Sequence, residues 1–126
     1  MATPEIRLKR AYEPPAASDG TRVLIDRLWP RGVAKARAAI DHWFRDLAPS
    51  TELRRWFHHD PALWEEFQRR YAQELASHPG RLDELLQLAR AGPVTLVYGA
   101  RDEQHNDAVV LRRVLLERAG CRQQDG

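Results

Sequence analysis

The segment 21–32, TRVLIDRLWPRG, places an acid, two arginines and a tryptophan at the end of an apolar run. The run 23–25 has the β-branching of a strand buried on both faces, and Pro30 and Gly32 end any regular pairing soon after it. Ligands bind at the carboxyl ends of strands in open α/β sheets. The segment therefore predicts a ligand site, with these candidates: Asp26, Arg27, Trp29 and Arg31. A structural acid–arginine ion pair with the tryptophan at the core edge explains the pattern equally well.

A second segment, 98–106 (YGARDEQHN), follows another apolar run and opens a helical pattern. Its small residues leave room for a ligand, and the unpaired N–H groups of a helix start attract anions. The candidates here are Tyr98, Asp102, His105 and Asn106. The alternative is that Asp102 only caps the helix and that the two residues 105–106 lie on the surface of its first turn. If both segments follow parallel strands, their loops converge and share one open hollow.

The chemistry predicted for this hollow is anion binding. Guanidinium groups form paired hydrogen bonds with phosphate and carboxylate, and three arginines are placed to do so: Arg27, Arg31 and Arg54. Arg54 and Arg55 follow a capping serine on a short helix, where one faces solvent and the other joins the cluster. We expect a small anionic ligand (phosphate, nucleotide or carboxylate), with a nucleotide or phosphorylated metabolite preferred.

The same hollow has groups suited to proton transfer. Asp26 or Asp102 would act as the general base, and His105 or Tyr98 as its proton partner. The pattern does not separate an enzyme from a ligand sensor. The sequence has no glycine-rich nucleotide motif and no histidine pair at metal-ligand spacing, so we predict neither a cofactor nor a metal.

Composition limits the class of protein. The 126 residues are 43% hydrophobic and 30% charged, which is typical of a single globular domain. We expect this domain to span residues 1–120, with 121–126 as a loose polar tail. The single cysteine, Cys121, excludes a disulfide framework. No apolar run is long enough for a signal peptide or a membrane span, so the sequence predicts a cytoplasmic protein.

Charge leaves two further functions open. The formal charge is only +2, yet all basic residues except Lys9 and Lys35 are arginines. Genome composition or an anionic partner explains this bias. Because no basic tail or stripe is present, a nucleic-acid-binding accessory or regulatory role is possible but not favoured. A protein-interaction module is the other alternative, with Trp29 and Trp56 as exposed anchors.

The spacing of apolar residues predicts the elements that position these groups. Strands are expected at 5–10, 21–25 and 94–98, and helices at 50–57, 61–75, 82–91 and 104–119. Segment 33–39 reads as a loop or a short helical turn, and 40–48 fits a helix by periodicity but a strand by residue type. Ser50 and Asp60 are the expected N-caps. The alternation predicts an α/β fold, a small mainly parallel sheet of about four strands flanked by helices.

Four ordered motifs resemble one known family. They are DG-x-RVLIDRLWPRG at 19–32, LAPSTELRRWF at 47–57, F-xxx-Y-xx-EL at 67–75 and TLVYGARD-xx-HN at 95–106. Together they are similar to the YeaO-like family, a bacterial group of unknown function, and the resemblance extends over about residues 7–116. It implies a small α/β domain and a strand at 40–47.

The resemblance also implies motif positions. Seven of them are candidate ligand-binding residues: Arg27, Trp29, Arg31, Ser50, Arg54, Tyr98 and Asn106. Members of the family usually have a histidine directly after this asparagine, whereas this chain has Asp107. If that histidine is an essential proton carrier, His105 must replace it or activity is lost.

Overall fold

A sheet of four parallel strands lies at the centre of the computed structural model, which describes residues 4–120. The strands are β1 (Ile6–Arg10), β2 (Thr21–Leu24), β3 (His42–Trp43) and β4 (Val94–Tyr98). Their order is β1-β4-β2-β3, so β4 is paired on both sides and all five of its residues are buried. The α/β class and the parallel four-stranded sheet expected from the sequence are confirmed.

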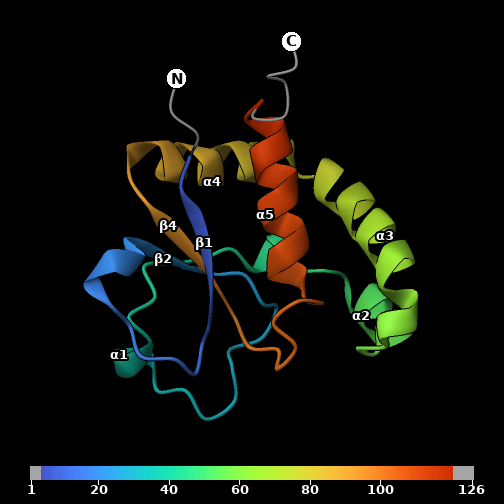
Figure 1. Ribbon diagram of the computed structural model, residues 1–126, viewed down its shortest axis with the longest axis horizontal. Coiled ribbons are helices and arrows are strands. Elements are labelled where there is room, and N and C mark those ends of the chain that lie inside the picture. The colour runs from blue at the N-terminus through green and yellow to red at the C-terminus, as the bar shows by residue number, and fades with distance from the viewer. Residues whose placement is uncertain (1–3, 121–126) are drawn as a thin grey trace.

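Five α-helices surround this sheet (Figure 1). They are α1 (Lys35–Ala38), α2 (Thr51–Phe57), α3 (Trp64–Ala76), α4 (Pro79–Ala91) and α5 (Asp107–Arg118). Helix α5 packs directly on β1 and β4, and α3 packs on α5 and α2. The large gap in sequence between β3 and β4 is filled by α2, α3 and α4, which build most of the helical layer.

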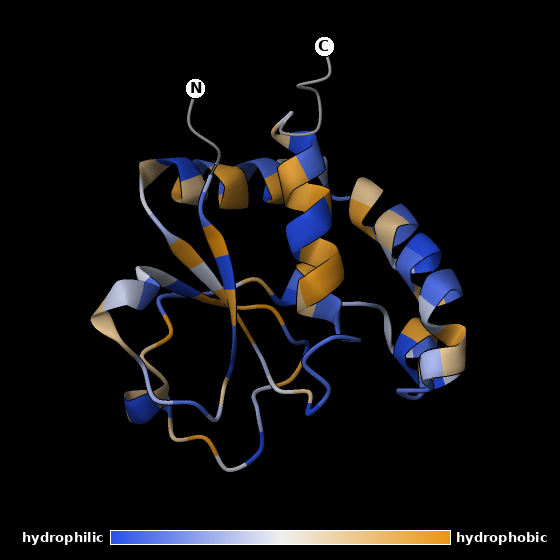
Figure 2. Cartoon of the chain, viewed as in Figure 1, coloured by the Kyte–Doolittle hydropathy of each residue, from blue (hydrophilic) through white to orange (hydrophobic). Residues whose placement is uncertain are grey.

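The two faces of the sheet are covered differently. Side chains alternate along a strand, so Val23 and Leu96 pack into the main core beneath the helices. Leu24 and Val97 point to the other face, where the loop carrying Trp29 covers them. Figure 2 shows hydrophobic segments on the strands and on the helices around them. The central strands β2 and β4 are therefore buried on both faces, as their apolar runs indicate, whereas the edge strands β1 and β3 are partly exposed.

The predicted boundaries needed three corrections. The segment 40–47 is a strand only at His42–Trp43, because the backbone turns into a 3-10 helix at Arg45–Leu47 once it passes the end of β2. The helix expected at 82–91 begins earlier, because Pro79 takes the first helical position, where its missing N–H costs nothing. Helix α5 begins at Asp107 rather than at 104. The expected tail at 121–126, with Cys121, lies outside the described residues.

A tight turn at Asp19-Gly20 starts β2. Gly20 has φ +66°, and the N–H of Thr21 donates to the carbonyl of Pro93 (3.0 Å), next to the start of β4. The side chain of Asp19 is buried and accepts hydrogen bonds from Lys9 (3.0 Å) and Arg22 (2.6 Å). This turn fixes where β2 begins and hence the register of β2 against β4.

Candidate functional site

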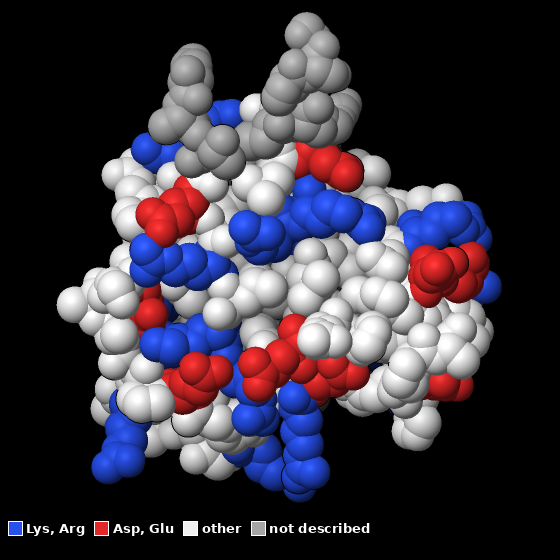
Figure 3. Space-filling view, viewed as in Figure 1, with Lys and Arg blue, Asp and Glu red and all other residues white. Residues whose placement is uncertain are grey.

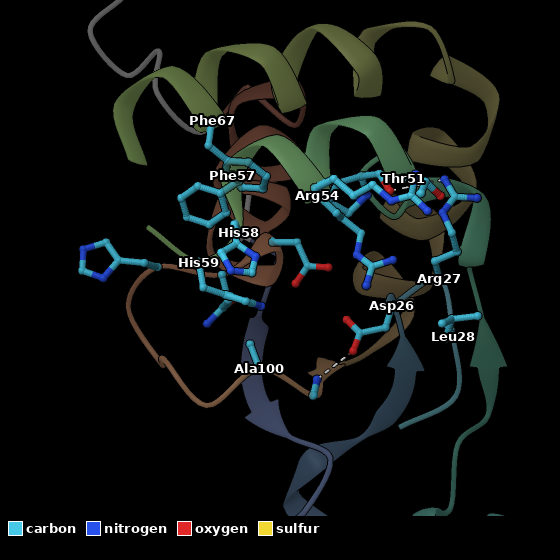
Figure 4. A pocket seen from close by; sticks show the side chains of 16 residues that line it. Asp26, Arg27, Leu28, Thr51, Arg54, Phe57, His58, His59, Phe67 and Ala100 are labelled. Carbon is cyan, nitrogen blue, oxygen red and sulfur yellow. Dashed lines mark hydrogen bonds between the residues drawn. The ribbon is translucent and has the colours of Figure 1, made fainter. Parts of the chain in front are cut away.

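The loops that follow β2 and β4 meet at the carboxyl end of the sheet. One carboxylate oxygen of Asp26 accepts a hydrogen bond from the backbone N–H of Gly99 (2.8 Å; Figure 4). A β-carbon at position 99 would lie 3.1 Å from that oxygen, so a glycine allows this approach. The two segments singled out in the sequence are therefore neighbours in space.

A cavity of about 690 Å³ opens beside this junction (Figure 4). Its walls come from four parts of the chain: the loop after β2, helix α2 with the residues flanking it, Phe67 of α3, and the loop from β4 into α5. Its size lies in the range that holds small-molecule ligands. An open hollow thus exists where the strand ends were expected to form one.

Half of the ten candidate residues line this cavity. They are Asp26, Arg27, Arg54, His105 and Asn106. The first three come from the segment after β2 and from α2, and the last two come from the loop before α5. The cavity therefore combines acidic, basic and amide groups from segments far apart in the sequence.

The other five candidates lie elsewhere. Trp29 packs edge-on against Trp43 on the opposite face of the sheet, and its indole N–H donates to the carbonyl of Val33 (2.6 Å). Arg31 is exposed, two residues further along the same loop. Tyr98 is buried at the end of β4, and burial raises the pKa of its hydroxyl. None of these three lines the cavity, and neither do Ser50 and Asp102.

Ser50 has a structural role at the start of α2. Its hydroxyl accepts from the N–H of Leu53 (3.1 Å) and donates to the carboxylate of Glu74 (2.6 Å), whose other oxygen accepts the N–H of Ser50 (2.8 Å). The expected N-cap at this position is confirmed. The second expected N-cap, Asp60, is also confirmed: its carboxylate accepts a hydrogen bond from the N–H of Ala62 (3.0 Å).

We expect Ser50→Ala to lower the free energy of unfolding by about 1–2 kcal/mol, because it removes a helix cap and a charge-assisted hydrogen bond. Urea titration followed by circular dichroism measures the loss. Ser77→Ala is the matched control, since the exposed hydroxyl of Ser77 only donates to a carbonyl at the end of α3. Equal effects of the two substitutions would contradict the role given to Ser50.

Asp102 and His105 form a local pair at the rim of the cavity. The Asp102 carboxylate accepts the backbone N–H groups of Gln104 and His105 (2.9 Å each), which lower its pKa. Its second oxygen lies 2.9 Å from Nδ1 of His105. The cap of α5 is Asn106, whose side chain accepts from the N–H of Val109 (3.1 Å), so the alternative interpretation of Asp102 as the cap of this helix was wrong.

The carboxyl group of Asp107 lies against that of Asp26, and the two share a hydrogen bond. Burial, the nearby Asp26 charge and this hydrogen bond raise the pKa of Asp107 well above its usual value. Burial also raises the pKa of Asp26, partly offset by the Gly99 N–H and by the charges of Arg54 and His59. Both pKa values are raised, and the larger rise at Asp107 makes it the group of the pair that favours the proton.

Asp107 was not among the candidates chosen from the sequence. The sequence feature that could have pointed to Asp107 is the aspartate itself, which stands where the YeaO-like family usually has a histidine. His105 does not replace such a histidine beside Asp26, because its ring packs edge-on against Trp64 and pairs with Asp102. In this chain a second carboxyl group occupies the place next to Asp26.

Three arginines line the cavity without a carboxylate partner among residues 4–120: Arg27, Arg54 and Arg55. Arg27 donates one Nη to the carbonyl of Pro49 (3.3 Å), while its Nε is buried with no hydrogen-bond partner. Elsewhere ion pairs are common, as between Arg118 and Asp83 (2.7 Å). The cavity therefore concentrates guanidinium groups whose charge is not neutralised by direct pairing.

Two consecutive histidines at the cavity wall have left-handed backbones. His58 ends α2 with φ 46°, and His59 follows with φ 54°. Non-glycine residues rarely adopt this conformation, although histidine tolerates it better than most. This sharp turn leads the chain from α2 into the 3-10 helix Pro61–Leu63 and places both histidines in the wall of the cavity.

The exposed hydrophobic and charged residues relate to the two alternative functions, a protein-interaction module and nucleic-acid binding. Trp29 and Trp56 are half-buried, and the exposed large hydrophobic residues of the described chain are Tyr12 and Leu28. Basic and acidic side chains interleave on the face in Figure 3. Within residues 4–120 no three histidine, cysteine or acidic residues gather as metal ligands, and no helix there is long and apolar enough to cross a membrane.

Comparisons with known proteins identify close relatives. Residues 5–126 match a family model described as "Inactive DUF488-N3 subclade". Over 106 residues the chain is 43% identical to the uncharacterized protein YeaO of Escherichia coli K12, covering 84% of this chain and 92% of the relative. It is 41% identical over 110 residues to the uncharacterized protein Rv3073c of Mycobacterium tuberculosis, covering 87% and 92%. No solved structure matches the chain.

Proposed function

Because the chain belongs to the DUF488 family, in the subclade that its family model describes as inactive, we propose that it binds a small phosphorylated molecule without transforming it. The site is the cavity beside Asp26 and Gly99. The observation that carries this proposal is the set of three cavity arginines without carboxylate partners in the described chain.

The charge of the cavity favours an anion. Arg27, Arg54 and Arg55 supply three positive charges, while Asp26 and Asp107 supply at most two negative ones, and the raised pKa of each opposes full ionisation of the pair. Guanidinium groups match the oxygens of phosphate in geometry as well as in charge.

The description of the subclade as inactive favours a binding role over catalysis. The local structure supports the same view, since the contacts of the His105 ring are with Asp102 and Trp64 and not with the carboxyl pair. A sensor or carrier of a phosphorylated metabolite needs only affinity and selectivity. Both can come from the arginine cluster and the shape of the cavity.

Isothermal titration with inorganic phosphate and adenosine 5′-monophosphate tests the proposal. We expect Arg54→Ala to weaken binding about tenfold or more, because a charge-assisted hydrogen bond contributes about 1.5–3 kcal/mol. Arg90→Ala is the matched control: Arg90 is exposed on the last turn of α4, and its removal changes the net charge equally. Equal weakening by both substitutions, or no binding of either anion to the unsubstituted protein, would contradict the proposal.

A further inference from the structure

The carboxyl pair forms a polar surface of the cavity distinct from the arginines. Asp26 follows β2, Asp107 begins α5, and both line the cavity. One oxygen of Asp26 is occupied by the N–H of Gly99, and the two carboxyl groups hydrogen-bond to each other. Each carboxyl oxygen has two lone pairs, so acceptor capacity remains beyond these bonds.

The chemistry of this surface favours hydroxyl groups over an amine. A hydroxyl group donates one hydrogen bond and accepts others, so it can bind to either carboxyl group of the pair. An ammonium group would come close to the guanidinium group of Arg54, whose charge already acts on Asp26. The ligand group at this end of the cavity should therefore be uncharged.

The remaining wall has an apolar surface. The rings of Phe57 and Phe67 stack with their centroids 4.3 Å apart, and both residues line the cavity. In Figure 4 they lie above the His58 and His59 turn, while Arg54 and Asp26 lie on the other side. The cavity thus presents a cationic side, a hydroxyl-binding carboxyl pair and an aromatic wall to one ligand.

We infer that the ligand is a sugar phosphate, whose phosphate binds the arginines and whose hydroxyl groups bind the Asp26–Asp107 pair. This inference rests on the proposed phosphate-binding function and narrows it to one class of molecule. The volume of about 690 Å³ accommodates a pentose phosphate and leaves room for a larger substituent.

The experiment compares three probes on the unsubstituted protein by isothermal titration: D-ribose 5-phosphate, phosphoethanolamine and inorganic phosphate. We expect D-ribose 5-phosphate to bind at least tenfold more tightly than either of the others. Equal binding of all three would overturn the sugar assignment and leave the phosphate site intact. Tightest binding of phosphoethanolamine would also overturn it, since an ammonium group would then occupy the carboxyl pair. No binding of any probe would overturn both proposals.

Asp107→Ala then locates the hydroxyl site. We expect the preference for D-ribose 5-phosphate over inorganic phosphate to fall below threefold, with the affinity for inorganic phosphate retained. Asp102→Ala is the matched control, because it removes a carboxylate from the same loop without contacting Asp26. An unchanged preference in Asp107→Ala, with native circular dichroism, would show that the hydroxyl groups bind elsewhere. The comparison of probes on the unsubstituted protein does not depend on this variant.

Discussion

Asp107→Asn is expected to make the protein more stable at neutral pH, by about 1 kcal/mol or more. Burial next to Asp26 raises the pKa of Asp107 well above its usual value near 3.8. The folded protein therefore holds this proton more tightly than the unfolded chain does. Asparagine keeps a group that can donate to Asp26, and it removes a half-buried carboxyl group whose ionisation is disfavoured in the folded protein.

The sign of the pH dependence follows from this proton. Between the usual pKa and the raised one, the unfolded chain binds fewer protons than the folded protein, so the free energy of unfolding falls as pH rises. One such group changes the free energy of unfolding by at most about 1.4 kcal/mol per pH unit. The stabilising contribution of Asp107 is fully present below about pH 3.8. It decreases as pH rises from there to the raised pKa of Asp107, and above that pKa it is lost.

Urea titrations from pH 3 to pH 8 measure this effect. The two proteins should be closest in stability at low pH and should diverge as pH rises, with Asp107→Asn the more stable. The other groups that act on Asp26, Arg54 and His59, remain in both proteins, so their effects largely cancel in the comparison. A variant less stable than the unsubstituted protein at neutral pH would show that Asp107 is ionised and stabilising.

Asp102→Asn provides a control of opposite sign. Backbone N–H groups lower the pKa of Asp102, so its contribution to stability is present above the usual pKa and is lost as pH falls through the lowered one. Its substitution should therefore reduce stability at neutral pH and have less effect in acid. Two aspartates five residues apart should thus respond in opposite directions.

Gly20→Ala is expected to lower the free energy of unfolding by more than about 3 kcal/mol. A β-carbon at this position would lie 2.2 Å from the carbonyl oxygen of Pro93, and the residue has φ +66°. The clash is with backbone at the start of β4, so relief requires moving the central strand. Strain in such a conformation and overpacking each cost about 1–3 kcal/mol.

The matched control is Gly80→Ala in the first turn of α4, where an added β-carbon meets nothing within 4 Å. Alanine is favoured over glycine in helices, so this variant should be as stable as the unsubstituted protein or more stable by up to about 1 kcal/mol. Thermal unfolding followed by circular dichroism compares the two. A loss in Gly20→Ala no larger than the change in Gly80→Ala would contradict the close contact with Pro93.

The fold was largely predictable because its signals are local. Strands β2 and β4 contain short apolar runs bounded by loop residues, and β1 alternates apolar and charged residues. The predicted caps Ser50 and Asp60 mark the helix starts. Segment 40–48 was less predictable, since its two-residue strand depends on pairing with β2 rather than on its own sequence. Tertiary contacts decide such a segment, and periodicity cannot.

The site was predictable in position but only partly in composition. Adjacent parallel strands place their following loops together, which brings Asp26 beside Gly99. Beyond the strand end, however, sequence position does not say which way a side chain points. Trp29 turned to the opposite face of the sheet, and Arg55 and Asp107, which line the cavity, were not chosen as candidates. Their roles depend on where α2 and α5 dock.

The four chain segments that wall the cavity are spread from residue 26 to residue 107, and no two neighbouring elements form it alone. Closing such distant loops is entropically slow, so these contacts belong to the final, cooperative stage of folding. A partly folded chain would lack the cavity altogether. Ligand affinity should therefore report on the fully assembled native state, and ligand present during refolding should trap that state as it forms.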